Sequence, residues 1–285
     1  MVKIFLNFFK NIYSFFFALI LVFSCGESNT EDLEINAQEE ETVQLQLNAQ
    51  NAIEGISVLA GDLYELDAVA LDNDQLLDKG TEFLDCGTLY TEIMQSGRKV
   101  IRDFEKNCTT KQGFLVSGKI ISVITVDPVN FTANIRHTFE DFYLEGNKIE
   151  GTLEVMKLFV NAYGNPQANK TFDLSIYKKD GTVVSMKGKQ EREWIEGLAT
   201  RDHADDVFLI NGSYAITDQK GGVYTHRTKE PLRRELSCKH IVKGTVEFVK
   251  ESRTIVLDFG NGECDALATI EINGKLREIV LRDKY

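Results

Sequence analysis

The pattern of apolar positions along the chain changes its period near residue 86. Before that point, apolar residues recur every three or four positions: they are Ile53, Ile56, Leu59, Leu63 and Leu66. This spacing places side chains on one face of an α-helix. We therefore predict one or two helices between Val43 and Leu71, with Gly55 or Gly61 as a candidate break, and a loop that completes the segment 43–85.

After residue 86, apolar and polar residues alternate, which is typical of strands that bury one face. The stretches RTIVLDF and ATIEING show this alternation. Turn residues separate such runs at Asp180-Gly181, Gly221-Gly222 and Asn273-Gly274, with a slightly longer turn at 145–147. For Asp180-Gly181 we predict a type I′ hairpin turn, because that turn requires positive φ. Asn211-Gly212 is either a turn or a bulge within a long strand.

These patterns predict a mainly β protein. Residues 86–285 are expected to form one long-stranded antiparallel meander of about twelve to fourteen strands, arranged as a sandwich or an open barrel. A short N-terminal helical segment precedes the meander. With 43% hydrophobic residues in 285, the chain is long enough and apolar enough to bury a substantial core.

A short internal repeat lies within the β region. Residues 96–124 and 251–280 both carry an arginine five positions before Asp-Phe, then a cysteine, then Gly-Lys ten positions after that cysteine. A repeat of this length indicates two related hairpin units inside one domain. We assign these units to 86–126 and 238–282.

Four cysteines of the β region fit the hairpin units. Cys86 and Cys108 lie equally far from Gly97, and Cys238 and Cys264 lie equally far from Glu251. Residues equidistant from a hairpin turn face each other across the ladder, so we predict the disulfides Cys86–Cys108 and Cys238–Cys264. A zinc site is excluded because no C-x₂₋₄-C pair occurs. Free buried thiols remain the alternative.

The N-terminus has the pattern of an export signal, residues 1–24. Two lysines precede an uncharged, largely apolar run at 12–23, which is shorter than the ~20 residues of a membrane-spanning helix. Cys25 follows directly, flanked by Ser24 and Gly26, with Val22 three positions before it. This arrangement resembles the lipobox of bacterial lipoproteins, in which the cysteine is diacylated and becomes the new N-terminus. We therefore predict a lipid anchor at Cys25; an ordinary secretory signal is the alternative.

Charge is distributed unevenly along the chain. The net charge is −12, and from Gly26 to Asp78 there are fourteen acidic residues and no lysine or arginine. Such a segment argues against nucleic acid as a partner and against adhesion to anionic lipid headgroups. We predict that residues 25–42 form an acidic tether, so that the membrane is a partner only through the N-terminal lipid.

Motifs of catalysis and metal binding are few. The chain contains no G-x-S-x-G, H-E-x-x-H, G-x-x-x-x-G-K-[ST] or G-x-G-x-x-G sequence. The stretch RDHADD gathers His203, Asp205 and Asp206, which could hold a divalent cation, although an acidic surface turn is the expected interpretation. Trp194 is expected to pack in the core, with a glycan-stacking platform as the alternative. We predict no catalytic residue, no metal and no cofactor.

The remaining three histidines stand on strand-like runs without metal-ligand spacing. They are His137, His226 and His240. We expect them to be structural histidines at surface or half-buried positions.

Longer motifs resemble a group of uncharacterised lipoproteins common in Bacteroidota. The resemblance rests on HTFEDFYLEGNKIEGTLEV, on REWIEG followed by DDVFLINGSY, and on EPLRRELSCKHIVKGTVEF running into LDFGNGECDALATIEINGKLREIVL. It covers about residues 80–282. The resemblance implies lipidation and a β-rich envelope domain, and it offers no known activity. The acidic residues just after Cys25 also resemble the signal that sends such lipoproteins to the outer face of the outer membrane; a solvated linker is the alternative.

Together these features predict a non-enzymatic lipoprotein of the outer membrane, on the cell surface or the periplasmic face, with a structural or binding role. An envelope protein or a glycan is the expected kind of partner. A carrier that holds a lipid or other apolar ligand in an open β-barrel is the alternative, and a dry apolar cavity would favour it. A hydrolase that combines His203, Asp205 or Asp206 with a group from a distant strand is the third possibility.

Overall fold

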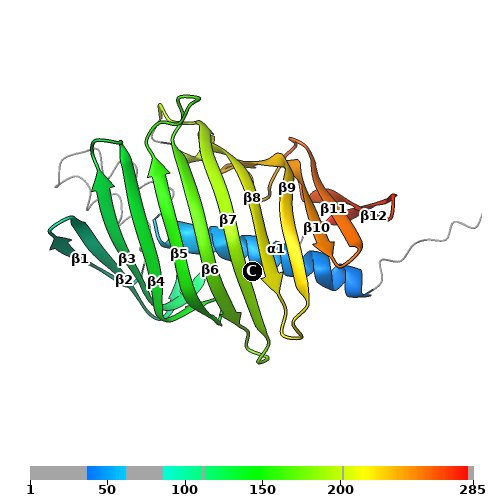
Figure 1. The fold of residues 1–285 in the computed structure, drawn as a ribbon, viewed down its shortest axis with the longest axis horizontal. Helices are drawn as coiled ribbons and strands as arrows, with labels where there is room; N and C mark the ends of the chain where they lie inside the picture. The colour runs from blue at the N-terminus through cyan, green and yellow to red at the C-terminus, as the bar shows by residue number, and fades with distance from the viewer. Residues whose placement is uncertain (1–36, 62–85, 111–112, 201, 282–285) are drawn as a thin grey trace, which may run out of the picture.

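Within the residues that the structure describes, the fold is one α-helix and one antiparallel sheet of 13 strands, whose spatial order is the order of the sequence (Figure 1). The computed structural model describes residues 37–61, 86–110, 113–200 and 202–281. The predicted long-stranded meander is confirmed, and its strands form a single open sheet and not a sandwich. The signal peptide, Cys25 and most of the predicted tether lie outside the described residues.

The strands are mostly long, and each one pairs with its neighbours in sequence. Their bounds are β1 Thr88–Met94, β2 Gly97–Thr109, β3 Leu115–Asp127, β4 Thr132–Leu144, β5 Asn147–Leu158, β6 Gln167–Tyr177, β7 Val183–Glu196, β8 Val207–Thr217, β9 Val223–Glu235, β10 Lys243–Lys250, β11 Arg253–Asn261, β12 Leu267–Ile272 and β13 Lys275–Val280.

The hairpin turns are confirmed in position, but the turns at 145–147 and around Asp180-Gly181 differ in length from the predictions. Asn273-Gly274 is a two-residue turn in which both residues have positive φ. The turn at 145–147 is also two residues, since Leu144 already pairs with Asn147. Around Asp180-Gly181 the loop is longer than a type I′ turn, because the Lys178 amide donates to the Thr182 carbonyl. The alternatives for Asn211-Gly212 are resolved as a register shift inside β8, between Ile210 and Ser213.

The helix α1, Ala37–Leu59, begins six residues before the predicted start at Val43. Assigning residues 37–42 to the tether was therefore wrong. These residues are mostly alanine, glutamine and glutamate, which favour helices without any apolar periodicity. Gly55 does not break the helix; a Cβ there would lie 3.2 Å from Leu144, so glycine permits close packing. The helix ends just before Gly61, whose φ is +79°.

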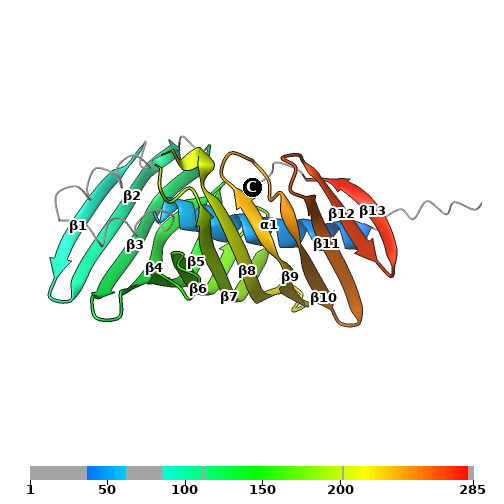
Figure 2. The ribbon, with the colours of Figure 1, turned by 90° about the horizontal axis from the view of Figure 1, so that it is seen from above.

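The helix runs across the strands on one face of the sheet, which we call the inner face (Figures 1 and 2). Its 23 residues span about 35 Å, enough to cross about seven strands. Near its N-terminal end, Val43 packs in a cluster with Leu232 and Phe248 of β9 and β10. Farther along, Ile53 and Ile56 pack with the core of β2–β9. The inner face and α1 together therefore form the hydrophobic core.

Both predicted disulfides are present, Cys86–Cys108 and Cys238–Cys264, each with a Cα–Cα distance of 5.6 Å. In the first hairpin the turn is not centred on Gly97, because Met94 pairs directly with Gly97. A register shift between β2 and β3, after Phe104, lies on the approach to Cys108. In the second, Lys250 pairs with Arg253, so the turn does include Glu251.

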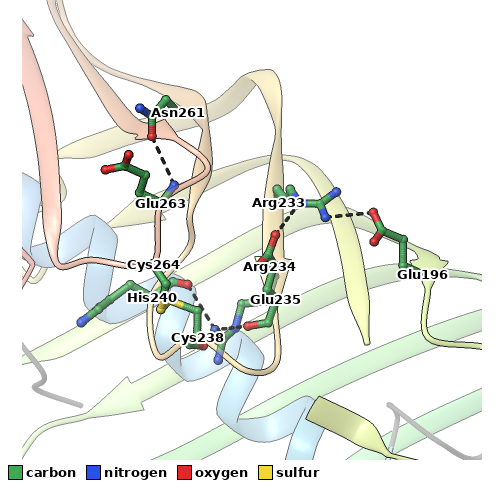
Figure 3. A network of polar contacts seen from close by, with 9 residues as sticks. All are labelled: Glu196, Arg233, Arg234, Glu235, Cys238, His240, Asn261, Glu263 and Cys264. Carbon is green, nitrogen blue, oxygen red and sulfur yellow. Dashed lines mark hydrogen bonds and ion pairs between the residues drawn. A yellow bond between two sulfur atoms is a disulfide. The ribbon is translucent and has the colours of Figure 1, made fainter. Parts of the chain in front are cut away.

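Polar contacts order the loop that carries Cys238 (Figure 3). The Arg234 guanidinium donates to the carbonyl oxygens of Glu235, Cys238 and His240, and Arg233 forms ion pairs with Glu196 and Glu235. Each hairpin unit has one disulfide: Cys86–Cys108 joins the residues before β1 to β2, and Cys238–Cys264 joins the loops that flank the β10–β11 hairpin. The Gly-Lys pairs of the two units differ in position, since the first lies inside β3, whereas in the second Gly274 ends the β12–β13 turn and Lys275 begins β13.

Candidate functional site

Buried polar side chains gather on the inner face, on five consecutive strands under α1. They are Lys157 on β5, Lys170 on β6, Gln190 and Arg192 on β7, Tyr214 on β8 and His226 on β9. Directly opposite residues of an antiparallel pair point to the same side of a sheet. Lys157 and Arg192 both pair with Ala168, which places these two cations in one row across three strands. Lys170 pairs with Gln190 in the next row of the same face.

The three cations form what we call the cationic cluster: Lys157, Lys170 and Arg192. Their exposed fractions are 0%, 2% and 5%. The helix contributes polar partners, because Glu54 Oε2 lies 2.9 Å from an Arg192 nitrogen and Ser57 Oγ lies 2.6 Å from Lys170 Nζ. Glu54 and Ser57 are three residues apart and so share one side of α1. The Arg192 guanidinium also lies 4.0 Å from the centre of the Phe208 ring.

Beside this cluster, the contact between α1 and β7–β9 leaves polar atoms without hydrogen-bond partners. Among the residues that the structure describes, these atoms belong to five buried side chains: Gln46 (Oε1 and Nε2), Gln190 (Oε1), Arg192 (Nε), Tyr214 (Oη) and His226 (Nδ1). Each such atom costs about 1–3 kcal/mol relative to a satisfied one. The interface between α1 and these strands is therefore far from optimal as a purely structural contact.

Tyr214 and His226 form a stacked pair in this region. Their ring centres are 4.1 Å apart and their planes differ by 12°. Burial lowers the pKa of His226 to about 3. Burial, with a smaller contribution from the Glu54 carboxylate, raises the pKa of the Tyr214 hydroxyl well above its usual value. Both side chains are therefore neutral at pH 7.

A second polar group lies on the inner face of β2–β4. Arg102 donates to Ser122 Oγ at 3.2 Å, and Ser122 Oγ lies 2.8 Å from His137 Nδ1. The serine and the histidine are both fully buried. The hydroxyl is therefore enclosed between the strands and has no contact with solvent.

Two hollows accompany these groups. A cleft of about 190 Å³ lies along α1, between the helix and the ends of the β4–β5 and β6–β7 hairpins; its apolar lining is Leu45, Ala49, Ala52, Leu144, Ile149, Ile176 and Val184. A shallower hollow of about 670 Å³ spans β3–β7 and is lined mostly by polar side chains, which include Arg136, Glu154, Lys189 and Glu191. The exposed members of that lining belong to the face opposite α1, which we call the outer face.

The acidic stretch around Asp205 and the tryptophan Trp194 were the candidate site residues of the sequence, and their described side chains make local packing and hydrogen-bond contacts. The Asp205 carboxylate accepts a hydrogen bond from the Thr200 hydroxyl, while Asp206 is buried; the His203 side chain is outside the described part. No group of three potential metal ligands occurs within residues 37–61, 86–110, 113–200 and 202–281. Trp194 is 9% exposed and packs against Phe208, as expected for a core residue.

The histidines differ from the sequence-based expectation. His137 and His226 are fully buried, not at the surface or half-buried as predicted, because both point inward on the face that α1 covers. Only His240 of the three lies at an intermediate exposure.

The cationic cluster was missed from the sequence, although a signal was present. Lys157 continues an inward-facing series with Leu153 and Val155, and Lys170 lies between the inward-facing Ala168 and Phe172. A lysine at a position where the alternation of the strand predicts a buried apolar side chain indicates a buried charge, which needs hydrogen-bond or ionic partners.

Comparison with protein-family models, with curated proteins and with solved structures found no match. Within the described part of the chain, no helix is both long enough and apolar enough to cross a membrane.

Proposed function

We propose that this chain is a lipid-anchored protein of the bacterial cell envelope that acts by binding and not by catalysis. The observation that carries the proposal is the pair of disulfides, Cys86–Cys108 and Cys238–Cys264. Disulfides persist in compartments outside the reducing cytoplasm. Together with the lipobox-like sequence around Cys25, they favour export followed by acylation, and the acidic stretch after Cys25 favours the outer membrane.

A binding role agrees with the layout of the sheet. The outer face offers a wide polar hollow over β3–β7, which fits an envelope protein or a glycan. The inner face holds charged and polar groups beyond what packing alone requires. The buried hydroxyl of Ser122 and the local roles of Asp205 and Asp206 give no support to a hydrolase.

A carrier for an apolar or amphiphilic ligand is the second candidate. The apolar cleft beside α1 favours it. However, α1 occupies the inner face, so a ligand larger than the 190 Å³ cleft enters only if the helix moves aside.

Metabolic labelling with palmitate tests the proposal. We expect the label in the wild-type protein and in Cys86→Ala, and no label in Cys25→Ala. Surface proteolysis of intact cells then separates the cell surface from the periplasmic face. Labelling that persists in Cys25→Ala, or a cytosolic protein with four free thiols in the β domain, would contradict the proposal.

A further inference from the structure

We infer that the inner face beneath α1 is the binding site for a single-chain amphiphile with an anionic headgroup, and that α1 covers this site until the ligand replaces it. The inference deepens the proposed binding function and rests on it. In this arrangement the Glu54 carboxylate stands where the anionic headgroup of the ligand binds.

The charges beneath the helix require an anion. Arg192 is 5% exposed, and its ion-pair partner beneath the helix is the Glu54 carboxylate of α1, 2.9 Å away. If α1 moved off the sheet and no ligand took its place, Arg192 would lose its carboxylate partner on the helix. A buried cation without a counter-charge is strongly unfavourable. Exchange of the helix is therefore favourable only for a ligand that brings its own negative charge.

The unpartnered atoms also match such a headgroup. Three of them are hydrogen-bond donors, one on α1 and two on the sheet: Gln46 Nε2, Arg192 Nε and Tyr214 Oη. These side chains are 1%, 5% and 4% exposed. Gln46 lies between Val43, which packs over β9–β10, and Glu54, which contacts β7. Oxygen atoms of a carboxylate or a phosphate would accept hydrogen bonds from the two donors that the sheet supplies.

The rest of the inner face requires an alkyl chain. Next to Arg192 across β7–β8 lies Ile210, which belongs to an apolar cluster that reaches β12 and includes Leu232 and Phe248. Val43 of α1 covers this surface. A purely ionic ligand would leave the apolar strands exposed, and a purely apolar ligand would leave Arg192 unpaired. An amphiphile satisfies both.

Fluorescence titration with dansyl-labelled undecanoic acid, and with its uncharged methyl ester, tests the inference. The protein is the full chain with Cys25→Ala, purified without detergent. We expect the acid to bind at least about tenfold more tightly than the ester.

Glu54→Gln removes the internal competitor and is expected to raise affinity for the acid about tenfold, because the covering helix then binds less well. Arg192→Gln is expected to lower that affinity by at least about tenfold.

Lys187→Gln is the matched control, since Lys187 forms an exposed ion pair with Asp173 on the outer face, away from both hollows. Its affinity should equal that of the parent chain. Circular dichroism and thiol titration verify that each variant is folded and oxidised; Lys170→Gln replaces Arg192→Gln if the latter does not fold. Three results would overturn the inference: equal affinity for the acid and the ester, an affinity of Glu54→Gln for the acid no higher than that of the parent chain, or no binding of the acid to the parent chain and to Glu54→Gln. Palmitate labelling at Cys25 is independent of these results, so the two proposals fail separately.

Discussion

The two faces of the sheet use the same kind of ion pair in different surroundings. On the outer face, Arg136 pairs with Glu154 across β4 and β5, and both side chains are about half exposed, at 55% and 53%. On the inner face, Arg192 pairs with Glu54 of α1, and the two side chains are 4% and 22% exposed. The outer pair joins neighbouring strands, whereas the inner pair joins elements 138 residues apart in sequence.

This difference shows where the fold carries a cost that packing does not explain. The charges of an exposed ion pair remain solvated by water, so the pair contributes little to the free energy of unfolding, and its loss costs little. Beneath α1 the pair is largely removed from water, and beside it Gln46 and Tyr214 keep polar atoms unpartnered. Natural proteins tend to break the rules of a satisfied core at functional sites. This contrast is the reason for placing the proposed ligand site on the inner face, and the following experiments test it.

Removal of the inner arginine should have the largest effect. Arg192→Met is expected to lower the free energy of unfolding by about 3 kcal/mol, because Glu54 keeps a partly buried charge without its partner. Adding Glu54→Leu should recover most of this loss, since both charges are then gone. Urea unfolding measures both values. A loss below 1 kcal/mol in the single variant would show that the pair behaves as an exposed one.

The stability of the protein should fall in acid because of His226. Its pKa is near 3 in the folded protein and about 6.5 when unfolded, so between these values the unfolded chain binds the extra proton. The contribution of neutral His226 to the free energy of unfolding is therefore fully present above pH 6.5. Below that pH it decreases by about 1.4 kcal/mol per pH unit, which amounts to about 2 kcal/mol by pH 5. His226→Phe, which retains the stack on Tyr214, should remove this part of the slope, whereas His240→Gln should retain it. Identical slopes in His226→Phe and wild type would contradict the burial of a neutral imidazole.

Gln46→Leu should stabilise the protein. Both polar atoms of the Gln46 amide are buried without partners, and leucine is of similar size with a similar helix propensity. We expect a gain of about 1–2 kcal/mol in unfolding free energy. Gln44→Leu is the control, because the Gln44 amide is half-buried and donates to Asn48. If Gln46→Leu destabilises the protein more than the control does, the amide has partners in solution.

Arg136→Gln should have the smallest effect. The Arg136–Glu154 pair is exposed, so its loss should stay within the ~1 kcal/mol typical of surface ion pairs. The same urea titration measures it. A change as large as that of Arg192→Met would remove the distinction between the two faces.

Much of the fold could be predicted from the sequence because it depends on local signals. Alternation and turn residues indicated the meander, and the spacing of Cys238 and Cys264 around Glu251 indicated their disulfide. The start of α1 could not be found from periodicity, since its first residues, Ala37–Glu41, contain no large apolar side chain and are helical through propensity alone. The length of the loop around Gly181 depends on backbone hydrogen bonds that a dipeptide does not specify.

The candidate site was beyond local analysis. Lys170 meets Ser57, which is 113 residues away, and Arg192 meets Glu54 at a similar separation. No periodicity indicates that a helix near the N-terminus lies across strands β5–β9. Only the lysines at inward-facing positions gave a sign that the inner face holds more than a hydrophobic core.

Hydrogen exchange across α1 tests the central claim most directly. The amides of Ala37–Leu59 and of strands β5–β7 would be followed with and without saturating dansyl-labelled undecanoic acid. We predict that the ligand makes the α1 amides exchange faster while β5–β7 stay protected, because the ligand takes the place of the helix on an intact sheet. Exchange in α1 that is unchanged or slower under saturating ligand would contradict the account.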